Sequence, residues 1–110
     1  MAWPEDIKAR FPDWGTDRIL LRWPSIRQNV TVGQTVRGDV IARAPFGVWI
    51  DIGIGHPALL LVPEMEGARE RSISFDEYPL IGMIVEARIV SLGERGEINL
   101  TQHPVAGAPG

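Results

Sequence analysis

The amino-acid sequence predicts an all-β domain, a five-stranded Greek-key barrel that is closed or nearly closed. From residue 30 onward, short apolar segments of strand length alternate with turns rich in glycine and proline. Two of these segments are entered by the same apolar-Gly-x-x-Val pattern, at residues 32–36 and 81–85. The connection after the third segment is long and contains short stretches typical of single helical turns. This is the layout of small barrels, whose closure removes exposed sheet edges.

The first strand is expected at residues 36–43, where polar and apolar side chains alternate. Regular alternation places Val36, Val40 and Ala42 on one side, toward the interior. The other side then carries Arg37, Asp39, Ile41 and Arg43. Gly38 has an inward position, where a barrel strand has to bend sharply.

The second strand is expected at residues 46–52 and has two large aromatic residues near its start. Its alternate apolar residues form the inner face, so the indole of Trp49 points away from the core. Phe46 has the opposite parity and shares a surface with Trp49 only if the backbone departs from regular pleating. Gly47 permits such a bulge or a close backbone approach. The pair forms a stacking platform for unpaired bases or, alternatively, closes one end of the barrel.

The other three strands are expected at residues 58–62, 83–92 and 97–101. Between the third and fourth strands, residues 63–67 and 76–78 each have the composition of a helical turn. Glycine-flanked residues 93–96 fit a hairpin loop between the last two strands. The predicted organisation is therefore an OB-type barrel at residues 30–103, followed by a flexible tail at 104–110, with disorder expected from His103 onward.

Residues 1–29 form a separate N-terminal extension that holds four of the eight aromatic side chains. These are Trp3, Phe11, Trp14 and Trp23. A short helix is expected to begin near Pro4 and to end before Pro12. Residues 19–23 fit either a short strand or one apolar turn, which Pro24 ends in both cases. The aromatic residues either pack on the outside of the barrel or form a docking surface for another protein.

Composition and charge exclude several classes of function. The chain has no cysteine, which excludes a disulfide framework, a thiolate nucleophile and a cysteine-containing zinc site. No basic signal-peptide start and no membrane-spanning apolar run are visible, so a soluble, cytoplasmic protein without a membrane partner is expected. The net charge is −3, and residues 30–110 hold six basic against ten acidic side chains. Any anionic ligand must therefore find a local basic patch.

No set of residues indicates catalysis, a metal site or a cofactor. His56 precedes Pro57 and is expected in a turn, and His103 is far from it in the pattern, so the two do not suggest a metal site. The carboxylates Glu64, Glu66 and Glu70 lie in a polar connection, where nothing buries them to shift a pKa. The glycines do not form a strand, phosphate-binding loop and helix in succession. A non-enzymatic protein is expected.

Four segments together resemble the RNA-binding domain named after ribosomal protein S-one, which is an OB-fold module. They are VGQTVRGDV (32–40), FGVWIDIG (46–53), LIGMIVEARIV (80–90) and GEINLT (96–101). Each is weak individually, whereas their order and spacing are fairly specific. The resemblance implies a ligand face on the second and third strands, with single-stranded RNA as the usual ligand.

Carried over to this chain, the resemblance implies stacking by Phe46 and Trp49. Departures from the family pattern occur at Leu61, where the family often has His, and at Gly93 and Glu97, where it often has Asp and Arg. Phosphate contacts are expected from Arg37, Arg43 and Arg95, which border the face. The leading hypothesis is weak, largely sequence-tolerant binding of single-stranded RNA. The alternatives are a protein-interaction module on an OB barrel that has lost RNA binding, with the N-terminal extension as the contact for a protein partner, and self-association around Trp49.

Overall fold

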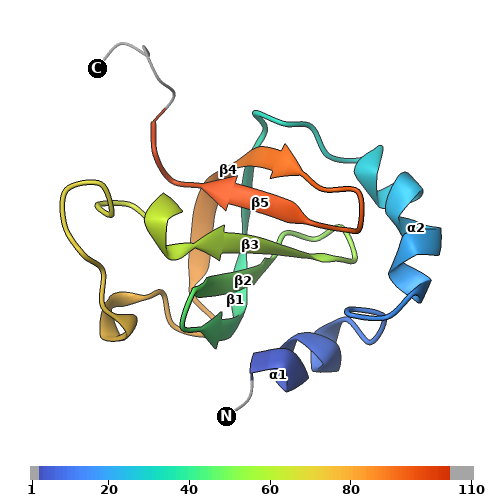
Figure 1. Cartoon of the computed structure of the whole chain (residues 1–110), viewed down its shortest axis with the longest axis horizontal. Helices are drawn as coiled ribbons and strands as arrows, with labels where there is room; N and C mark the ends of the chain where they lie inside the picture. Colours follow the sequence, from blue (N-terminus) through green and yellow to red (C-terminus); the bar gives the residue numbers. More distant parts are fainter. Residues whose placement is uncertain (1–2, 105–110) are drawn as a thin grey trace.

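The computed structural model describes residues 3–104 and contains a closed five-stranded barrel preceded by two helices (Figure 1). The strands are β1 (Thr35–Ala44), β2 (Gly47–Asp51), β3 (Pro57–Leu61), β4 (Ile84–Leu92) and β5 (Ile98–Thr101). They close in the order β1-β2-β3-β5-β4, and all neighbours are antiparallel except β3 and β5. The predicted barrel of OB type is confirmed.

One core fills the barrel and extends to both of its ends. Inward aliphatic side chains of the strands form its centre, and they include Val40, Val48, Ile50, Leu60, Ile89, Ile98 and Leu100. At one end, helix α2 (Arg18–Arg27) adds Ile19, Trp23 and Ile26. At the other end, the connection with the short 3-10 helices η1 (Val62–Glu64) and η2 (Phe75–Glu77) adds Met65 and Tyr78. Both ends of the barrel are thus closed by chain outside the sheet (Figure 1).

Helix α2 corrects the expectation that Pro24 ends the apolar segment at residues 19–23. Pro24 lies inside the helix and is exposed, while the buried residues Ile19, Trp23 and Ile26 follow helical spacing. Proline removes one backbone N–H from the helical ladder, which normally breaks a helix interior. Burial of the apolar face outweighs that loss, because tertiary packing supplies most of the stability of short helices.

A β-bulge in β1 changes which side chains face outward. Val40 pairs with Ile50 of β2, but Ala42 pairs with Trp49, so Ile41 is an extra residue on β1. Ile41 and Ala42 both lie in the apolar cluster on the outer surface. The side chains of two consecutive apolar residues therefore both lie on the outer surface of the barrel.

The bulge overturns two expectations about β1. Ala42 does not face inward with the other apolar residues of the strand, because it lies beside the outward Trp49. Arg37 and Arg43 do not share a side either, since Arg43 pairs with the inward Val48 after the shift in register. Alternation read from sequence fails at this point because a bulge inserts one residue into the period.

The turn between β1 and β2 brings Phe46 to the outer surface. Phe46 lies in this turn, whereas Gly47 pairs regularly with Leu61 of β3. A Cβ atom at Gly47 would overlap the carbonyl oxygen of Leu60. Gly47 therefore serves a close backbone approach, not a bulge.

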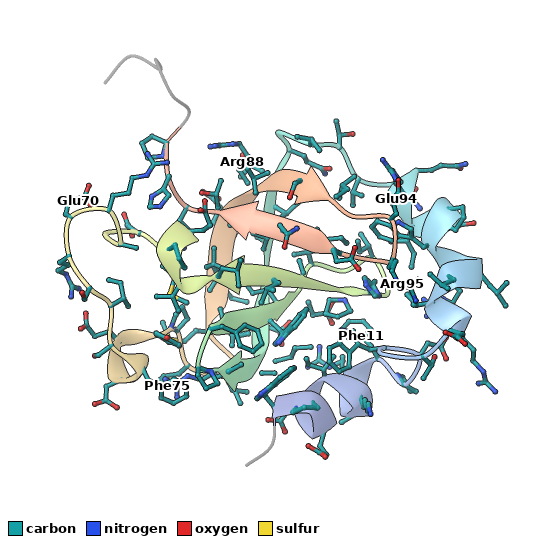
Figure 2. All side chains as sticks on the ribbon, in the orientation of Figure 1. Phe11, Glu70, Phe75, Arg88, Glu94 and Arg95 are labelled. Atoms are coloured by element: carbon teal, nitrogen blue, oxygen red, sulfur yellow. The ribbon has the colours of Figure 1, made fainter. Side chains whose placement is uncertain are left out.

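Helix α1 (Trp3–Arg10) lies against the outer surface of β1, as Figure 1 shows. Ile7 is fully buried, and Phe11, just after the helix, packs with it on Ile41 and Ala42. Figure 2 shows Phe11 between the helix and the barrel. Trp3, Phe11 and Trp14 therefore pack on the outside of the barrel, as expected, whereas Trp23 is part of the core that closes one barrel end.

An ion-pair network fastens the same helix to the sheet. Arg10 Nη1 donates to Asp51 Oδ2 at 2.7 Å, and Arg10 Nη2 donates to Asp39 Oδ2 at 3.3 Å. The bond to Asp51, with the nearby charge of Asp39, raises the pKa of Arg10 above its ordinary value. One guanidinium thereby bridges the two strand carboxylates where α1 crosses β1 and β2.

The C-terminal segment is ordered through His103, contrary to expectation. His103 is buried, its Nε2 lies 2.6 Å from the carbonyl oxygen of Pro63, and its backbone N–H donates to Thr101 Oγ1. Residues 105–110 of the expected flexible tail lie outside the described residues. Between positions 3 and 104, no helix has the length and apolar character needed to cross a membrane.

Truncation of the buried Ile7 tests whether the extension is an integral part of the fold. Ile7→Ala is expected to lower the free energy of unfolding by about 2–5 kcal/mol, because it leaves a cavity between α1 and β1. Urea unfolding followed by far-UV circular dichroism gives this value. The matched control is Leu21→Ala, since Leu21 is 84% exposed. Equal stability of the two variants would contradict the packing of α1.

Candidate nucleic-acid interface

A row of outward side chains crosses the barrel from β1 to β4. Cross-strand partners lie on the same face of a sheet, so strand register defines the row. Its members in spatial order are Ala42, Trp49, Leu59, Asn99 and Ser91. Asn99 Nδ2 donates to Ser91 Oγ at 3.1 Å, which orients the amide at the far end. The row joins an aromatic ring, an aliphatic side chain and a polar group.

Two tryptophans of the extension pack on Trp49. Trp3 is stacked with Trp49, with ring centroids 6.2 Å apart and planes 17° apart. Trp14 meets Trp49 edge-on at 5.5 Å, and Trp3 meets Phe46 edge-on at 5.2 Å. The pair predicted as a stacking platform is therefore brought together, but part of its surface is already covered by Trp3 and Trp14.

The indole N–H of Trp49 is buried under this cover. Among residues 3–104 it has no hydrogen-bond acceptor. An unpaired buried donor costs about 1–3 kcal/mol relative to one that reaches water or a partner. Docking of the extension on Trp49 is therefore favoured by apolar burial and opposed by the loss of this hydrogen bond.

A cavity of about 320 Å³ lies between the extension and the barrel, next to Trp49. Its extension wall consists of residues 14–17, 19 and 20. Its barrel wall includes Trp49, Leu59 and Asn99 of the row, and residues 95–98 from the loop between β4 and β5 and the start of β5. The volume is at the lower limit of about 300–1,000 Å³ typical of cavities that bind small organic ligands.

The charged residues around the cavity have both signs. Arg95 supplies a cation, and Asp17 and Glu97 supply two carboxylates. All three are exposed, so they form its rim. Glu97 Oε1 accepts the backbone N–H of Arg95 at 3.3 Å, which ties this carboxylate to the loop. The cavity therefore has both apolar and polar walls, with Asn99 and His56 among the polar groups, and its rim has a net negative charge.

His56 lies in the bend before β3, as expected for a turn residue, and its buried side chain forms part of the wall of the same cavity. Its Nε2 lies 2.5 Å from the carbonyl oxygen of Gly96, which can only accept, so Nε2 carries the proton. Burial disfavours the charged ring and lowers the pKa of His56 below its ordinary value. In the described part of the chain, no three His, Cys, Asp or Glu residues gather in a group able to hold a metal ion.

The three arginines expected to border the face do not lie together. Arg95 lies at the cavity, in the loop between β4 and β5 (Figure 2). Arg37 is exposed on β1, opposite Glu86 of β4. Arg43 Nη2 donates to the carbonyl oxygen of Phe75 at 2.6 Å, and its guanidinium lies 4.3 Å from the Phe75 ring centroid. Of the three, the structure brings only Arg95 close to Trp49.

Four residues of the site were missed by reading the sequence. Leu59 and Asn99 belong to the row, and Trp3 and Trp14 cover its aromatic end. The alternation of β5 contained a usable signal, because Ile98 and Leu100 face inward and leave Asn99 outward. No local signal connects Trp3 or Trp14 with Trp49, since that contact joins distant parts of the chain.

Comparison with solved structures identifies the fold. GSP13 from Bacillus subtilis superposes with a TM-score of 0.54 at 18% identity, over 74% of this chain and 65% of that chain. The alpha subunit of aIF2 from Pyrococcus abyssi gives 0.57 at 19% identity, over 71% and 30%. RNase R of Mycoplasma genitalium, in complex with ribose methylated single-stranded RNA, gives 0.53 at 16% identity, over 76% and 14%. The chain has the fold of the S-one type RNA-binding domain.

Sequence comparison finds a similar protein among curated sequences. Over 73 residues, the chain is 30% identical to a polyribonucleotide nucleotidyltransferase from Protochlamydia amoebophila (strain UWE25). The match covers 66% of this chain and 10% of that protein. The chain thus spans about one tenth of the length of the curated relative. A scan against protein-family models finds no match.

The buried His56 generates a pH dependence of stability. Its pKa is lowered in the folded state, so the unfolded chain takes up the proton first as the pH falls. The contribution of neutral His56 is complete above its unfolded pKa of about 6.5 and is lost as the pH falls through the lowered value. We expect the free energy of unfolding, measured in urea, to decrease from pH 7 toward pH 5. His56→Gln, which keeps a donor for Gly96, should reduce this slope; an unchanged slope would contradict the assignment.

Proposed function

We propose that the chain is a non-enzymatic nucleic-acid-binding module that binds single-stranded RNA weakly, largely without sequence preference, by aromatic stacking. One observation supports it most directly: the outward Trp49 stands in register with Leu59 and Asn99 and lines a cavity with Arg95 at its rim. An indole offers its π-surface to any base, worth about 1–3 kcal/mol per stacked base. An amide nearby can hydrogen-bond a base edge or ribose.

The charge distribution supports weak binding. Phosphate neutralisation dominates most nucleic-acid affinities, and here Arg95 is the one predicted cationic contact that lies at the cavity. Asp17 and Glu97 oppose phosphate at the same rim. Arg37 and Arg43 remain candidates for phosphate contacts only along a longer path over other parts of the barrel. Stacking therefore has to supply most of the free energy of binding.

The similar proteins support the ligand class. One solved structure with this fold is a complex of RNase R with single-stranded RNA, and another is an a/eIF2alpha–aDim2p–rRNA complex from Pyrococcus horikoshii. In each of them this fold is a minor part of the chain, covering 14% and 47%. We accordingly propose the binding of RNA for this chain and none of the activities of the larger proteins.

Removal of the indole tests the proposal. Trp49→Ala is expected to weaken binding of a short single-stranded RNA by about tenfold, in line with the loss of one stacked base. Fluorescence anisotropy at low salt measures the dissociation constant, and circular dichroism checks the fold. Phe75→Ala is the matched control, because Phe75 is 45% exposed and lies at the other end of the barrel (Figure 2). Unchanged affinity in a folded Trp49→Ala protein would reject the stacking site.

Arg95 is expected to act through its charge. Arg95→Gln should weaken RNA binding by a similar factor for different sequences and reduce the slope of log affinity against log salt by about one. Arg37→Gln is the control, because it removes the same charge from β1 at a position opposite Glu86 that does not line the cavity. If Arg37→Gln changed the salt slope and Arg95→Gln did not, the phosphate path would lie over β1 and β4.

The alternative is a protein-interaction module that uses the extension. Its aromatic residues are already packed against the barrel, but Leu20 and Leu21 of α2 are exposed at 37% and 84%. Deletion of residues 1–29 would not test it cleanly, because Ile7 and Trp23 belong to the packed core regions. Leu21→Ser is the suitable variant. Loss of a protein partner in this variant, with no RNA binding by the wild type, would favour the alternative.

A further inference from the structure

We propose that the cavity beside Trp49 takes the 3′-terminal nucleoside of an RNA strand, with its free ribose hydroxyls, in preference to the interior of a strand. This inference rests on the proposed function and specifies its ligand. It depends on three features: a row that is closed at one end, a cavity with room for a single small ligand, and two carboxylates at its rim.

The row of outward side chains is open at β5 and closed at β1. Ala42 is buried beneath α1, and Trp3 is stacked on Trp49. A strand that lies along the row from Asn99 toward Trp49 therefore meets the extension at Trp49. It cannot continue over β1 without displacing α1, whose Ile7 is fully buried. The path along the row therefore ends at Trp49, which favours the end of a strand at this point.

The cavity matches a single nucleoside better than a longer segment. Its volume is about 320 Å³, and its walls include the rings of Trp14 and Trp49 and the side chain of Leu59. These surfaces suit the flat, apolar faces of a base. The Asn99 amide on the same wall offers both donors and an acceptor to base or ribose. The next nucleotides would follow the row toward β5.

The two carboxylates at the rim favour an RNA end that carries free hydroxyls over an end that carries a phosphate. Asp17 makes no side-chain capping hydrogen bond to α2, so its carboxylate is not used by the helix. Glu97 lies on the same rim. Ionised carboxylates accept hydrogen bonds from hydroxyls and repel phosphate oxygens. The 3′-terminal ribose carries its two free hydroxyls on neighbouring carbons, which matches two acceptors, whereas the free 2′- and 5′-hydroxyls of a 5′-terminal ribose are not adjacent.

A competition experiment with the full chain separates these ligands. A labelled single-stranded RNA of about twelve nucleotides is the reporter, and unlabelled RNAs of the same sequence displace it. They are a linear strand with a 3′-hydroxyl, a linear strand with a 3′-phosphate, and a covalently closed circle. We expect the 3′-hydroxyl strand to compete about tenfold better than either of the others. Phosphorylation of the 5′ end should have no effect.

Substitutions at the rim connect the preference with the carboxylates. Asp17→Asn and Glu97→Gln should each reduce the difference between the 3′-hydroxyl and 3′-phosphate strands. Glu94→Gln is the matched control, because Glu94 lies on the same loop but does not line the cavity (Figure 2).

The outcomes distinguish the inference from the proposed function. If the wild type binds the reporter but the circle competes as well as the 3′-hydroxyl strand, end recognition is rejected and RNA binding stands. A dependence on the 5′-phosphate would reject the assignment to the 3′ end. If the reporter does not bind at low salt, RNA binding itself is rejected. Loss of the 3′-hydroxyl preference in Asp17→Asn but not in Glu94→Gln would support the inference.

Discussion

The bulge in β1 creates an apolar patch on the outside of the barrel, and the arrangement of the site depends on covering that patch. Ile41 and Ala42 both face outward, where water would otherwise contact them. Ile7 and Phe11 bury them, and burial of each large apolar side chain contributes about 1.5–3 kcal/mol. Because α1 is anchored there, Trp3 at its first turn reaches Trp49.

This anchoring decides how a ligand can use the aromatic platform. A base stacked in place of Trp3 would gain about 1–3 kcal/mol. Displacing α1 would also expose Ile7 and Phe11 and separate Arg10 from Asp51, which together cost more than one stacked base returns. A ligand is therefore better accommodated in the cavity beside Trp49 than in place of the helix. The extension therefore stays packed on the barrel and forms part of the candidate binding face.

The departures from the S-one type pattern belong to a coherent local structure. A Cβ atom at Gly93 would overlap the Glu97 side chain, so glycine at one position makes room for glutamate at the other. Glu97 then folds back to the backbone N–H of Arg95 and holds the loop that carries this cation to the rim. Where the family often has Asp and Arg in this hairpin, this chain has Gly93 and Glu97. Glu97 supplies a carboxylate acceptor, and the cation is supplied by Arg95 in the loop.

Local pattern was sufficient for the barrel and for part of the site. Strand periodicity, glycine and proline turns, and the order of the segments led to the correct fold, and the parity of Trp49 placed its indole outward, because these features depend on neighbours in the chain. The bulge at Ile41, the continuation of α2 through Pro24 and the burial of His56 were not predicted. Each depends on contacts between distant residues that override local preference. For the same reason, the stacking of Trp3 on Trp49 and the cavity beside it arise only when the extension packs on the closed barrel.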